Sequence, residues 1–273
     1  MKRKIAVNGG KIFIGVVSLI FCSAPLAVAA EQGSIVVRES ERQFQTVEWG
    51  RTLSVFGKQN VGAKYLKINI TEYAPGTAHT LHRHPNQEEV IYILDGEGYS
   101  KTKAGEKRVR AGAFVFIPSN TDHATFNSRT DRPMRAIIMK APPDESGSKD
   151  EDPTSPGSSV VREDEREWEK VEWGRTMNIF GKRNVGARLL KINITEYAPG
   201  TAHTPHRHPG QEEVICVLEG EGITKTKAGE KPISARTFVY VPPDTDHATI
   251  NVLSDRPMRA IIIKSPHEEK AAK

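Results

Sequence analysis

The sequence contains few cysteines and few aromatic residues. Two cysteines occur among 273 residues, and Phe, Trp and Tyr together make up 7% of the chain. Cys22 lies in a segment with the features of a removable leader, so that only Cys216 remains and no internal disulfide is expected. We predict that Cys216 is a small buried apolar residue. Because neither a Gly-rich phosphate loop nor a Gly-x-Ser-x-Gly elbow nor a paired Cys-x-x-Cys occurs, those kinds of site are not expected.

A long apolar span is also missing. The apolar run 12–21 is shorter than the roughly 20 residues that a membrane span needs. Basic residues precede this run, and the small residues Val28-Ala29-Ala30 follow it, as in a secretory signal peptide. We therefore predict a signal peptide at residues 1–30, with an uncleaved anchor as the alternative. The mature chain is then expected in the periplasm or outside the cell.

The remainder of the chain has almost no excess of charge of either sign. The whole sequence carries a formal net charge of +5, but residues 1–30 hold four basic residues and no acidic one. Without them, 35 basic residues stand against 34 acidic ones, a net charge of +1. Since nucleic-acid binding needs a broadly basic face, no nucleic-acid partner is expected. No membrane contact is expected after the signal peptide has been cleaved.

The main feature of the sequence is an internal duplication. Residues 34–140 align with residues 158–264 at a constant offset of 124, without a gap and with 33 mismatches in 107 positions. The stretch between the copies, 141–159, is rich in Pro, Ser and acidic residues and is predicted to be a flexible linker. The predicted organisation is one domain at 34–140, a second at 160–264 and a C-terminal tail at 265–273.

Each copy has the pattern of an all-β domain. Short runs of β-branched and aromatic residues alternate with Gly- and Pro-containing turns, and no stretch shows a convincing helical period. Strands of the first copy are predicted at Tyr65–Tyr73, Glu89–Leu94, Phe114–Ile117, His123–Asn127 and Met134–Lys140. Short strands at this spacing predict a sandwich or small barrel in each copy.

The histidines are distributed unevenly. Eight of the nine fall in four pairs that the duplication relates, and only His267 has no counterpart. His82 and His84 would lie on one face of a strand, while Glu89 and His123 open later strands that can converge with it inside a barrel. Three imidazoles and a carboxylate around one point suit a first-row transition metal, and leave one or two coordination positions open for catalysis.

Two further histidines, His79 and His203, precede the first histidine of each group by three residues. Strict alternation points them away from the group and favours a position on the surface or at an interface. A β-bulge would instead turn them inward, toward a substrate.

The arrangement of these residues resembles that of the cupin family. The stretch Gly76-x5-His82-x-His84-x4-Glu89-x6-Gly96 resembles the first cupin motif, and Gly112-x5-Pro118-x-Asn120-x2-His123-x3-Asn127 resembles the second. The second copy repeats the motif residues Gly200, His206, His208, Glu213, Gly220, Pro242, His247 and Asn251. The resemblance covers both repeats. It implies a bicupin, with two tandem cupin-type jelly-roll barrels preceded by the signal peptide.

The resemblance also implies one divalent transition metal in each domain. Mn or Fe is expected, with Ni, Cu or Zn as alternatives. The implied ligands, three histidines and one glutamate per domain, are His82, His84, Glu89, His123, His206, His208, Glu213 and His247. Glu88 and Glu212 stand next to the assigned carboxylates. The spacing to the following glycine favours Glu89 and Glu213, but a slip of one residue stays open at this point.

The second motif departs from the family pattern at three positions. Asn120 and Asp244 stand where the family usually has a glycine, and Arg236 replaces the opening glycine that the first copy retains as Gly112. Asn and Asp tolerate a left-handed backbone better than most residues, so we expect those turns to survive. Arg236 puts the turn of the second copy, though not its ligands, in question.

The function implied by the resemblance is that of a metal-dependent enzyme. Bicupins similar to this chain include dioxygenases, oxalate-degrading enzymes and hydrolases of small nitrogen compounds. Because neither half lacks a ligand, we expect an enzyme of dioxygenase, decarboxylase or lyase type acting on a small oxygenated organic molecule. The alternative is a non-catalytic cupin that binds a metal or a small ligand, of sugar-binding or storage type. No acid or base beyond the ligands is identified, and homo-oligomer formation stays open.

Overall fold

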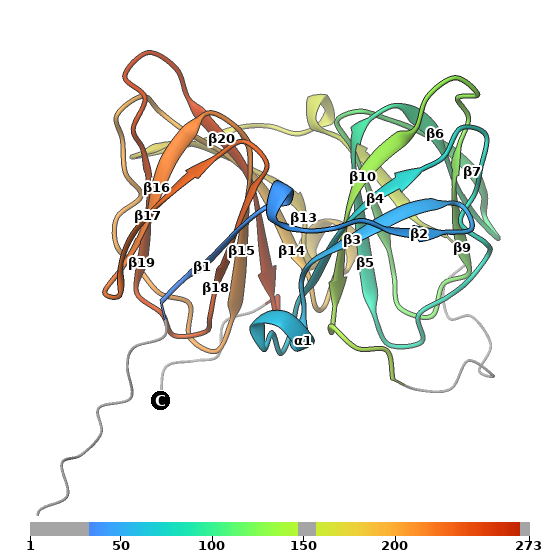
Figure 1. Ribbon diagram of the computed structural model, residues 1–273, viewed down its shortest axis with the longest axis horizontal. Coiled ribbons are helices and arrows are strands. Elements are labelled where there is room, and N and C mark those ends of the chain that lie inside the picture. The colour runs from blue at the N-terminus through green and yellow to red at the C-terminus, as the bar shows by residue number, and fades with distance from the viewer. Residues whose placement is uncertain (1–32, 147–156, 268–273) are drawn as a thin grey trace, which may run out of the picture. The chain divides into compact units, whose positions relative to one another are not determined.

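The structure, a computed structural model, describes residues 33–146 and 157–267 (Figure 1). The described residues form two β-barrels, one for each repeat, so the prediction of an all-β protein with two tandem domains is confirmed. The predicted signal peptide at 1–30, linker residues 147–156 and tail residues 268–273 lie outside the described residues. Among the described residues, no helix has the length and apolar character needed to cross a membrane.

The first repeat consists of short strands with two helical turns. Its elements are β1 (Ile35–Arg38), the 3-10 turn η1 (Glu39–Glu41), β2 (Gln45–Val47), β3 (Gly50–Phe56), α1 (Lys58–Val61), β4 (Lys67–Tyr73), β5 (Glu88–Asp95), β6 (Glu97–Thr102), β7 (Gly105–Arg110), β8 (Ala113–Ile117), β9 (His123–Asn127) and β10 (Met134–Ala141).

The second repeat has the same elements in the same order. They are β11 (Ser159–Arg162), η2 (Glu163–Glu165), β12 (Glu169–Val171), β13 (Gly174–Phe180), α2 (Lys182–Val185), β14 (Lys191–Tyr197), β15 (Glu212–Glu219), β16 (Glu221–Thr226), β17 (Gly229–Ser234), β18 (Thr237–Val241), β19 (His247–Asn251) and β20 (Met258–Ser265). The predicted linker thus begins with Ala141, the last residue of β10, and ends with Ser159, the first residue of β11.

Each barrel is built from one seven-stranded and one three-stranded antiparallel sheet. In the first barrel the strand orders are β11-β8-β5-β10-β4-β3-β2 and β7-β6-β9, and the second barrel has the equivalent orders. Strands β5 and β8 are buried along most of their length, whereas the hairpin of β6 and β7 carries the exposed lysines. The five strands predicted from the sequence coincide, to within two residues at each end, with β4, β5, β8, β9 and β10.

The two barrels exchange their first strands. Strand β1 pairs with β18 of the second repeat, in the register Val37↔Phe238. Reciprocally, β11 pairs with β8 of the first repeat, in the register Val161↔Phe114. Each seven-stranded sheet is therefore completed by a strand from the other copy, so the sequence repeat and the structural barrel do not coincide.

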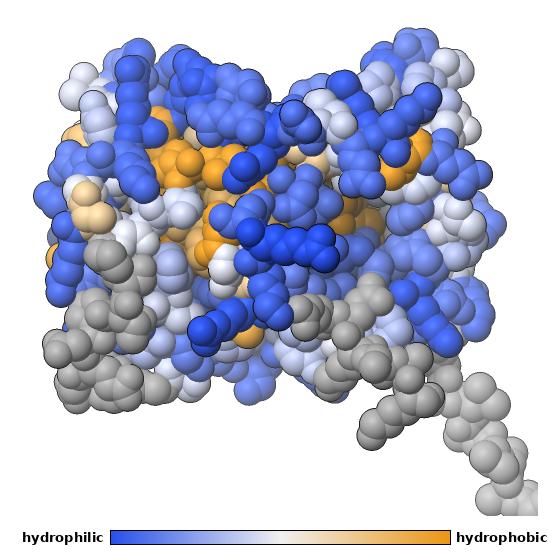
Figure 2. Space-filling model, turned by 180° about the vertical axis from the view of Figure 1, so that it is seen from behind, coloured by the Kyte–Doolittle hydropathy of each residue, from blue (hydrophilic) through white to orange (hydrophobic). Residues whose placement is uncertain are grey.

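A single hydrophobic core connects the two repeats. Phe180 of the second repeat packs between Phe114 and Phe116 of the first, with ring centroids 6.3 and 5.6 Å away. Cys216 lies in this core, 2% exposed, and burial raises the pKa of its thiol, in agreement with the predicted buried role. On the face shown in Figure 2, apolar residues gather in the middle, with hydrophilic residues on both sides.

Glu88 and Glu212 bind the neighbouring repeat and do not enter a histidine group. The Glu88 carboxylate accepts hydrogen bonds of 2.7 to 3.0 Å from the backbone N–H groups of residues 188, 189 and 190. Glu212 accepts the equivalent bonds of 2.6 to 3.0 Å from residues 64, 65 and 66. Both carboxylates are buried, so these charge-assisted bonds compensate for the loss of their hydration.

The unusual residues of the second motif adopt the backbone conformation of the glycines that they replace. Asn120 has φ 55°, Asp244 has φ 60°, and Arg236 has φ 67° where Gly112 has φ 82°. All four lie in the left-handed region, which asparagine and aspartate tolerate and arginine rarely adopts. The turn at Arg236 is thus preserved, at the cost of local backbone strain.

Candidate metal centre

The first histidine of the group lies in an irregular segment that β9 holds in place. Residues 74–87 form no regular strand, but His82 and His123 make an antiparallel bridge. The His82 N–H donates to the His123 carbonyl at 3.0 Å, and the His123 N–H donates back to the His82 carbonyl at 2.8 Å. Glu89 stands on β5, the next strand along the chain. A bridge and two strands therefore fix the positions of the group.

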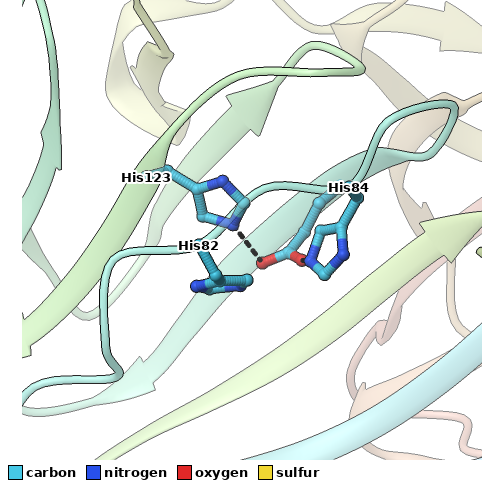
Figure 3. A group of neighbouring side chains, drawn as sticks. His82, His84 and His123 are labelled. Carbon is cyan, nitrogen blue, oxygen red and sulfur yellow. Dashed lines mark ion pairs between the residues drawn. The ribbon is translucent and has the colours of Figure 1, made fainter. Parts of the chain in front are cut away.

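The eight residues implied by the resemblance come together in two groups of four. In each group, one ligand atom from each of three histidines and one glutamate lies within 4.8 Å of all the others. Figure 3 shows the side chains of His82, His84 and His123 pointing toward one another, with a dashed line for the ion pair of His123. This pair joins His123 Nε2 to Glu89 Oε1 at 3.8 Å. The structure thus places Glu89, rather than Glu88, with the histidines.

Backbone carbonyls orient the imidazole rings. His82 Nδ1 lies 2.8 Å from the Thr80 carbonyl, and His123 Nδ1 lies 2.8 Å from the Thr121 carbonyl. An imidazole that donates Nδ1–H to a carbonyl leaves the lone pair of Nε2 free to bind a metal. Nε2 of both rings is buried and has no hydrogen-bond partner. His206 and His247 of the second repeat make the same contacts, at 2.8 and 2.9 Å.

Burial keeps most of these imidazoles in the neutral form that binds metals. It lowers the pKa of His82 to about 3 and the pKa of His206 to about 4, and it also lowers the pKa of His123. His247 differs, because burial lowers its pKa but the hydrogen bond and charge of Glu213 raise it by more. In the second repeat this carboxylate lies 3.4 Å from the imidazole, compared with 3.8 Å in the first.

The glutamate of each group is ionised. Burial raises the pKa of Glu89, but the charge of Lys140 and the close contact with His84 outweigh burial and hold this pKa well below its usual range. The pKa of Glu213 is lowered in the same way by Lys264 and His208. A buried carboxylate and three inward-facing ring nitrogens form a donor set that suits a divalent first-row transition ion. The residues present therefore fit the metal that the sequence implies, and their role as ligands stays a prediction.

His79 and His203 are half-buried and lie beside the groups, so the prediction that they point away from the groups is wrong. The His79 ring lies between Trp49 and His82, tilted against both, with centroids 4.4 and 3.9 Å away. His203 makes the equivalent contacts with Trp173 and His206, at 4.3 and 4.0 Å. Alternation does not apply to these residues because the segment that carries them is not a strand.

A cavity adjoins the group of the second repeat. It has a volume of about 160 Å³, and its lining includes His206 and Glu213 of the group together with His203 and Trp173. The cavity is smaller than the roughly 300–1,000 Å³ pockets that hold drug-sized ligands. It therefore fits a small molecule placed directly against the implied metal position.

Two functional candidates were missed by sequence reasoning. Glu145, in the predicted linker, places Oε1 2.5 Å from Nδ1 of His84. Lys140, the next-to-last residue of β10, places Nζ 2.8 Å from Nε2 of the same ring. Neither residue belongs to the motif. A charged residue at a strand end or in an acidic stretch is typical of the solvent-exposed surface. The recurrence of Lys140 as Lys264 was the one available signal.

The sequence pattern of the Cupin domain family matches residues 69–140 and 193–264, which together make up more than half of the chain. The chain belongs to the cupin family. Its two matches correspond to the two barrels, so it is a bicupin. Both matches contain the histidine and glutamate residues of one group, which connects the family assignment to the site.

Known proteins similar to this chain carry different names. It is 31% identical over 81 residues to the dimethylsulfoniopropionate lyase DddW of Ruegeria pomeroyi, and 30% identical over 115 residues to germin-like protein 1-2 of Oryza sativa subsp. japonica. These matches cover 30% and 37% of this bicupin and 51% of each relative, so the chain spans about half the length of either relative. A solved structure of Lactobacillus farciminis oxalate decarboxylase in complex with formate has a TM-score of 0.71 at 15% identity, covering 88% of this chain and 89% of the other. That likeness shows the shared fold.

Proposed function

We propose that this bicupin is a metal-dependent enzyme of the oxidoreductase or lyase type, with one site in each barrel, that acts on a small oxygenated organic molecule. Dioxygenase, decarboxylase and lyase chemistry all fall within this proposal. The observation that carries it is the set of buried ring nitrogens directed at one point beside a small cavity. A purely structural barrel would gain nothing by burying ring nitrogens, such as Nε2 of His82, His123 and His247, that lack hydrogen-bond partners.

The chain's own residues would bind the metal ion, orient its imidazole ligands and shield the site from bulk water. Three histidines and a glutamate would hold the ion in each barrel, and the carbonyls behind the rings fix their tautomers. Tyr197, Trp173 and Ile262 line the cavity of the second barrel and would exclude bulk water. A bound first-row ion supplies Lewis acidity, and Fe, Mn, Ni or Cu also allow redox chemistry.

The metal, the location and the partners belong to the same proposal. We propose Mn or Fe as the resident ion, with Ni, Cu or Zn as alternatives, because mixed imidazole and carboxylate sets accept all of them. Export to the periplasm or the medium is proposed from residues 1–30 of the sequence. The partner is a small molecule. A dimethylsulfoniopropionate lyase among the relatives and an oxalate decarboxylase with the same fold support this size of substrate.

The deciding experiment counts metals per chain. The protein is purified without a polyhistidine tag, reconstituted with each candidate ion and analysed by elemental mass spectrometry. Wild type is compared with His82→Ala/His84→Ala, with His206→Ala/His208→Ala and with the combined variant. We expect two ions per chain in wild type, one in each half-variant and none in the combined variant. The bound ion then selects the assays, with dioxygen uptake first for Fe, Mn, Ni or Cu.

Two results would separate the alternatives. Absence of metal from reconstituted wild type would overturn the enzyme proposal and favour a metal-free binding barrel. Metal-dependent binding of small oxygenated molecules without any conversion would favour the non-catalytic alternative. A conversion that disappears only in the combined variant would show that both barrels are active.

A further inference from the structure

A lysine points into each histidine group from the strand next to the glutamate. Lys140 Nζ lies 2.8 Å from His84 Nε2 and 3.0 Å from Glu89 Oε2, and the side chain is only 16% exposed. In the second barrel, Lys264 Nζ lies 2.9 Å from His208 Nε2 and 3.2 Å from Glu213 Oε2. The same contacts in both barrels indicate that this placement follows from the fold.

The register of the sheet explains why the lysine reaches the group. In the central sheet of the first barrel, Lys140 on β10 is opposite Glu89 on β5 and Lys67 on β4. Residues that are directly opposite on neighbouring strands project from the same face of a sheet. The row of Lys264, Glu213 and Lys191 repeats this arrangement in the second barrel, and all three residues line its cavity.

The lysine ammonium and a metal ion compete for the same lone pairs. A metal binds a histidine nitrogen at roughly 2.0–2.1 Å, and it needs the Nε2 lone pair that the ammonium contacts at 2.8 Å. One ring nitrogen cannot serve both cations at once. Binding of a metal must therefore displace the ammonium from His84 while leaving it tethered to β10, within a side chain's length of the ion.

The charges around the cavity favour an anion as the ligand. Its charged lining residues are the two ammonium groups of Lys191 and Lys264 and the single carboxylate of Glu213. A divalent ion on Glu213 would add two further positive charges. A small site with this excess of positive charge attracts a small anion and disfavours a neutral or cationic ligand.

We propose that Lys140 and Lys264 are the anion-binding residues of the two sites. Each ammonium competes with the metal for the histidine Nε2 and, once displaced, pairs with the carboxylate of a small substrate that also meets the metal. This inference rests on the proposed function, because it needs the metal to be bound. It narrows the substrate class from small oxygenated molecules to small carboxylates.

Metal affinity gives the first test. In a His206→Ala/His208→Ala background, which retains only the first site, Lys140→Met is compared with unsubstituted Lys140. Co²⁺ serves as the probe and is titrated by its visible absorption. We expect Lys140→Met to bind Co²⁺ about tenfold more tightly, because no ammonium has to be displaced and none repels the ion. The matched control is Lys101→Met, on the exposed hairpin, which should leave Co²⁺ affinity unchanged.

Anion affinity gives the second test. Acetate is titrated into the Co²⁺-loaded protein, and the change in absorption reports its binding near the ion. We expect Lys140→Met to bind acetate about tenfold more weakly than the background, since the metal contact remains and the ammonium contact is lost. Acetamide, which is neutral and similar in shape, should bind weakly to both and should show little dependence on Lys140.

The outcomes distinguish the inference from the function on which it rests. No Co²⁺ binding in the background or in any variant would contradict the metal site itself. Unchanged or weaker Co²⁺ binding in Lys140→Met would overturn the competition, and unchanged acetate binding would overturn the anion-binding role. Circular dichroism checks the fold. If Lys140→Met does not fold, Lys140→Gln replaces it, because the amide can still hydrogen-bond to Glu89 without carrying a charge.

Discussion

Oε1 of Glu145 lies 2.5 Å from Nδ1 of His84, although Glu145 follows the last strand of its barrel. The side chains of Lys58 and Asn86 contact the neighbouring residues Asp144 and Ser146, so the segment is held against the barrel on both sides of Glu145. A carboxylate on Nδ1 fixes the tautomer and directs Nε2 into the site, as the Thr80 and Thr121 carbonyls do for the other two rings.

Replacing Glu145 should therefore weaken the first metal site. We expect Glu145→Ala to lower metal affinity there by about 10-fold, in the range found for residues that orient a ligating histidine. The measurement is a metal titration in the His206→Ala/His208→Ala background. Asp144→Ala is the control, since the Asp144 carboxylate is exposed and pairs with Lys58, away from the histidine group. Equal affinities in the two variants would contradict this role of Glu145.

The buried carboxylates at the contact of the repeats should contribute to stability and not to metal binding. Truncation of Glu88 or Glu212 leaves three backbone N–H groups without their acceptor. We expect Glu88→Ala to lower the free energy of unfolding by about 3 kcal/mol, measured by urea denaturation. Glu106→Ala, on the exposed hairpin, should change it by less than about 0.5 kcal/mol. A loss of metal without a loss of stability would show that Glu88, not Glu89, serves the site.

Cutting the chain between the repeats should not separate them. A protease site placed within residues 147–156 would give two fragments, each of which still supplies one strand to the other's sheet. We expect the fragments to co-elute in size-exclusion chromatography and to separate only under denaturing conditions. The control is the same cleaved protein carrying Glu88→Ala and Glu212→Ala, which should dissociate at a lower urea concentration. Dissociation of the unsubstituted fragments in native buffer would contradict the strand exchange.

Acid should destabilise the protein after its metal has been removed. The pKa values of His82 and His206 are about 3 and about 4 in the folded state, below the ordinary value of 6.5, because of burial. Between pH 6.5 and 4 the unfolded chain therefore binds more protons than the folded one, so stability falls as the pH falls. We expect the melting temperature of chelator-treated protein to fall from pH 7.5 to pH 5. The His82→Ala/His206→Ala variant should show a weaker dependence, and an equally steep one would refute this assignment.

Motif spacing was sufficient to predict which eight residues come together, because the cupin motifs carry both residue type and distance along the chain. The spacing to Gly96 correctly placed Glu89 and not Glu88 in the group. The predicted orientation of His79 was wrong. Side chains alternate between the two faces only along a regular strand, and the segment that carries His79 is irregular. The prediction of metal ligation itself remains to be measured.

Other features had no local signal in the sequence. The exchange of β1 and β11 was hidden because the two repeats are so alike that either partner strand satisfies the same hydrophobic pattern. Lys140 is a charged residue near a strand end, a position that is usually solvated. Its pairing with Lys67 and Glu89 on the neighbouring strands directs it toward the histidine group. Glu145 lay in a Pro-rich acidic stretch, whose composition does not show that its first residues return to the barrel.

The exchange of strands makes the chain equivalent to a symmetric dimer whose halves have been fused. In a dimer of identical single-repeat chains, one change in the gene would alter both sites together. In this chain each half can acquire its own substitutions while the shared sheets keep the assembly intact. The repeats already differ in this way: Tyr92 occupies the position equivalent to Cys216, and Gly112 the position equivalent to Arg236. The two sites have the same set of four residues, three histidines and one glutamate, and are therefore free to evolve toward different substrates within one molecule.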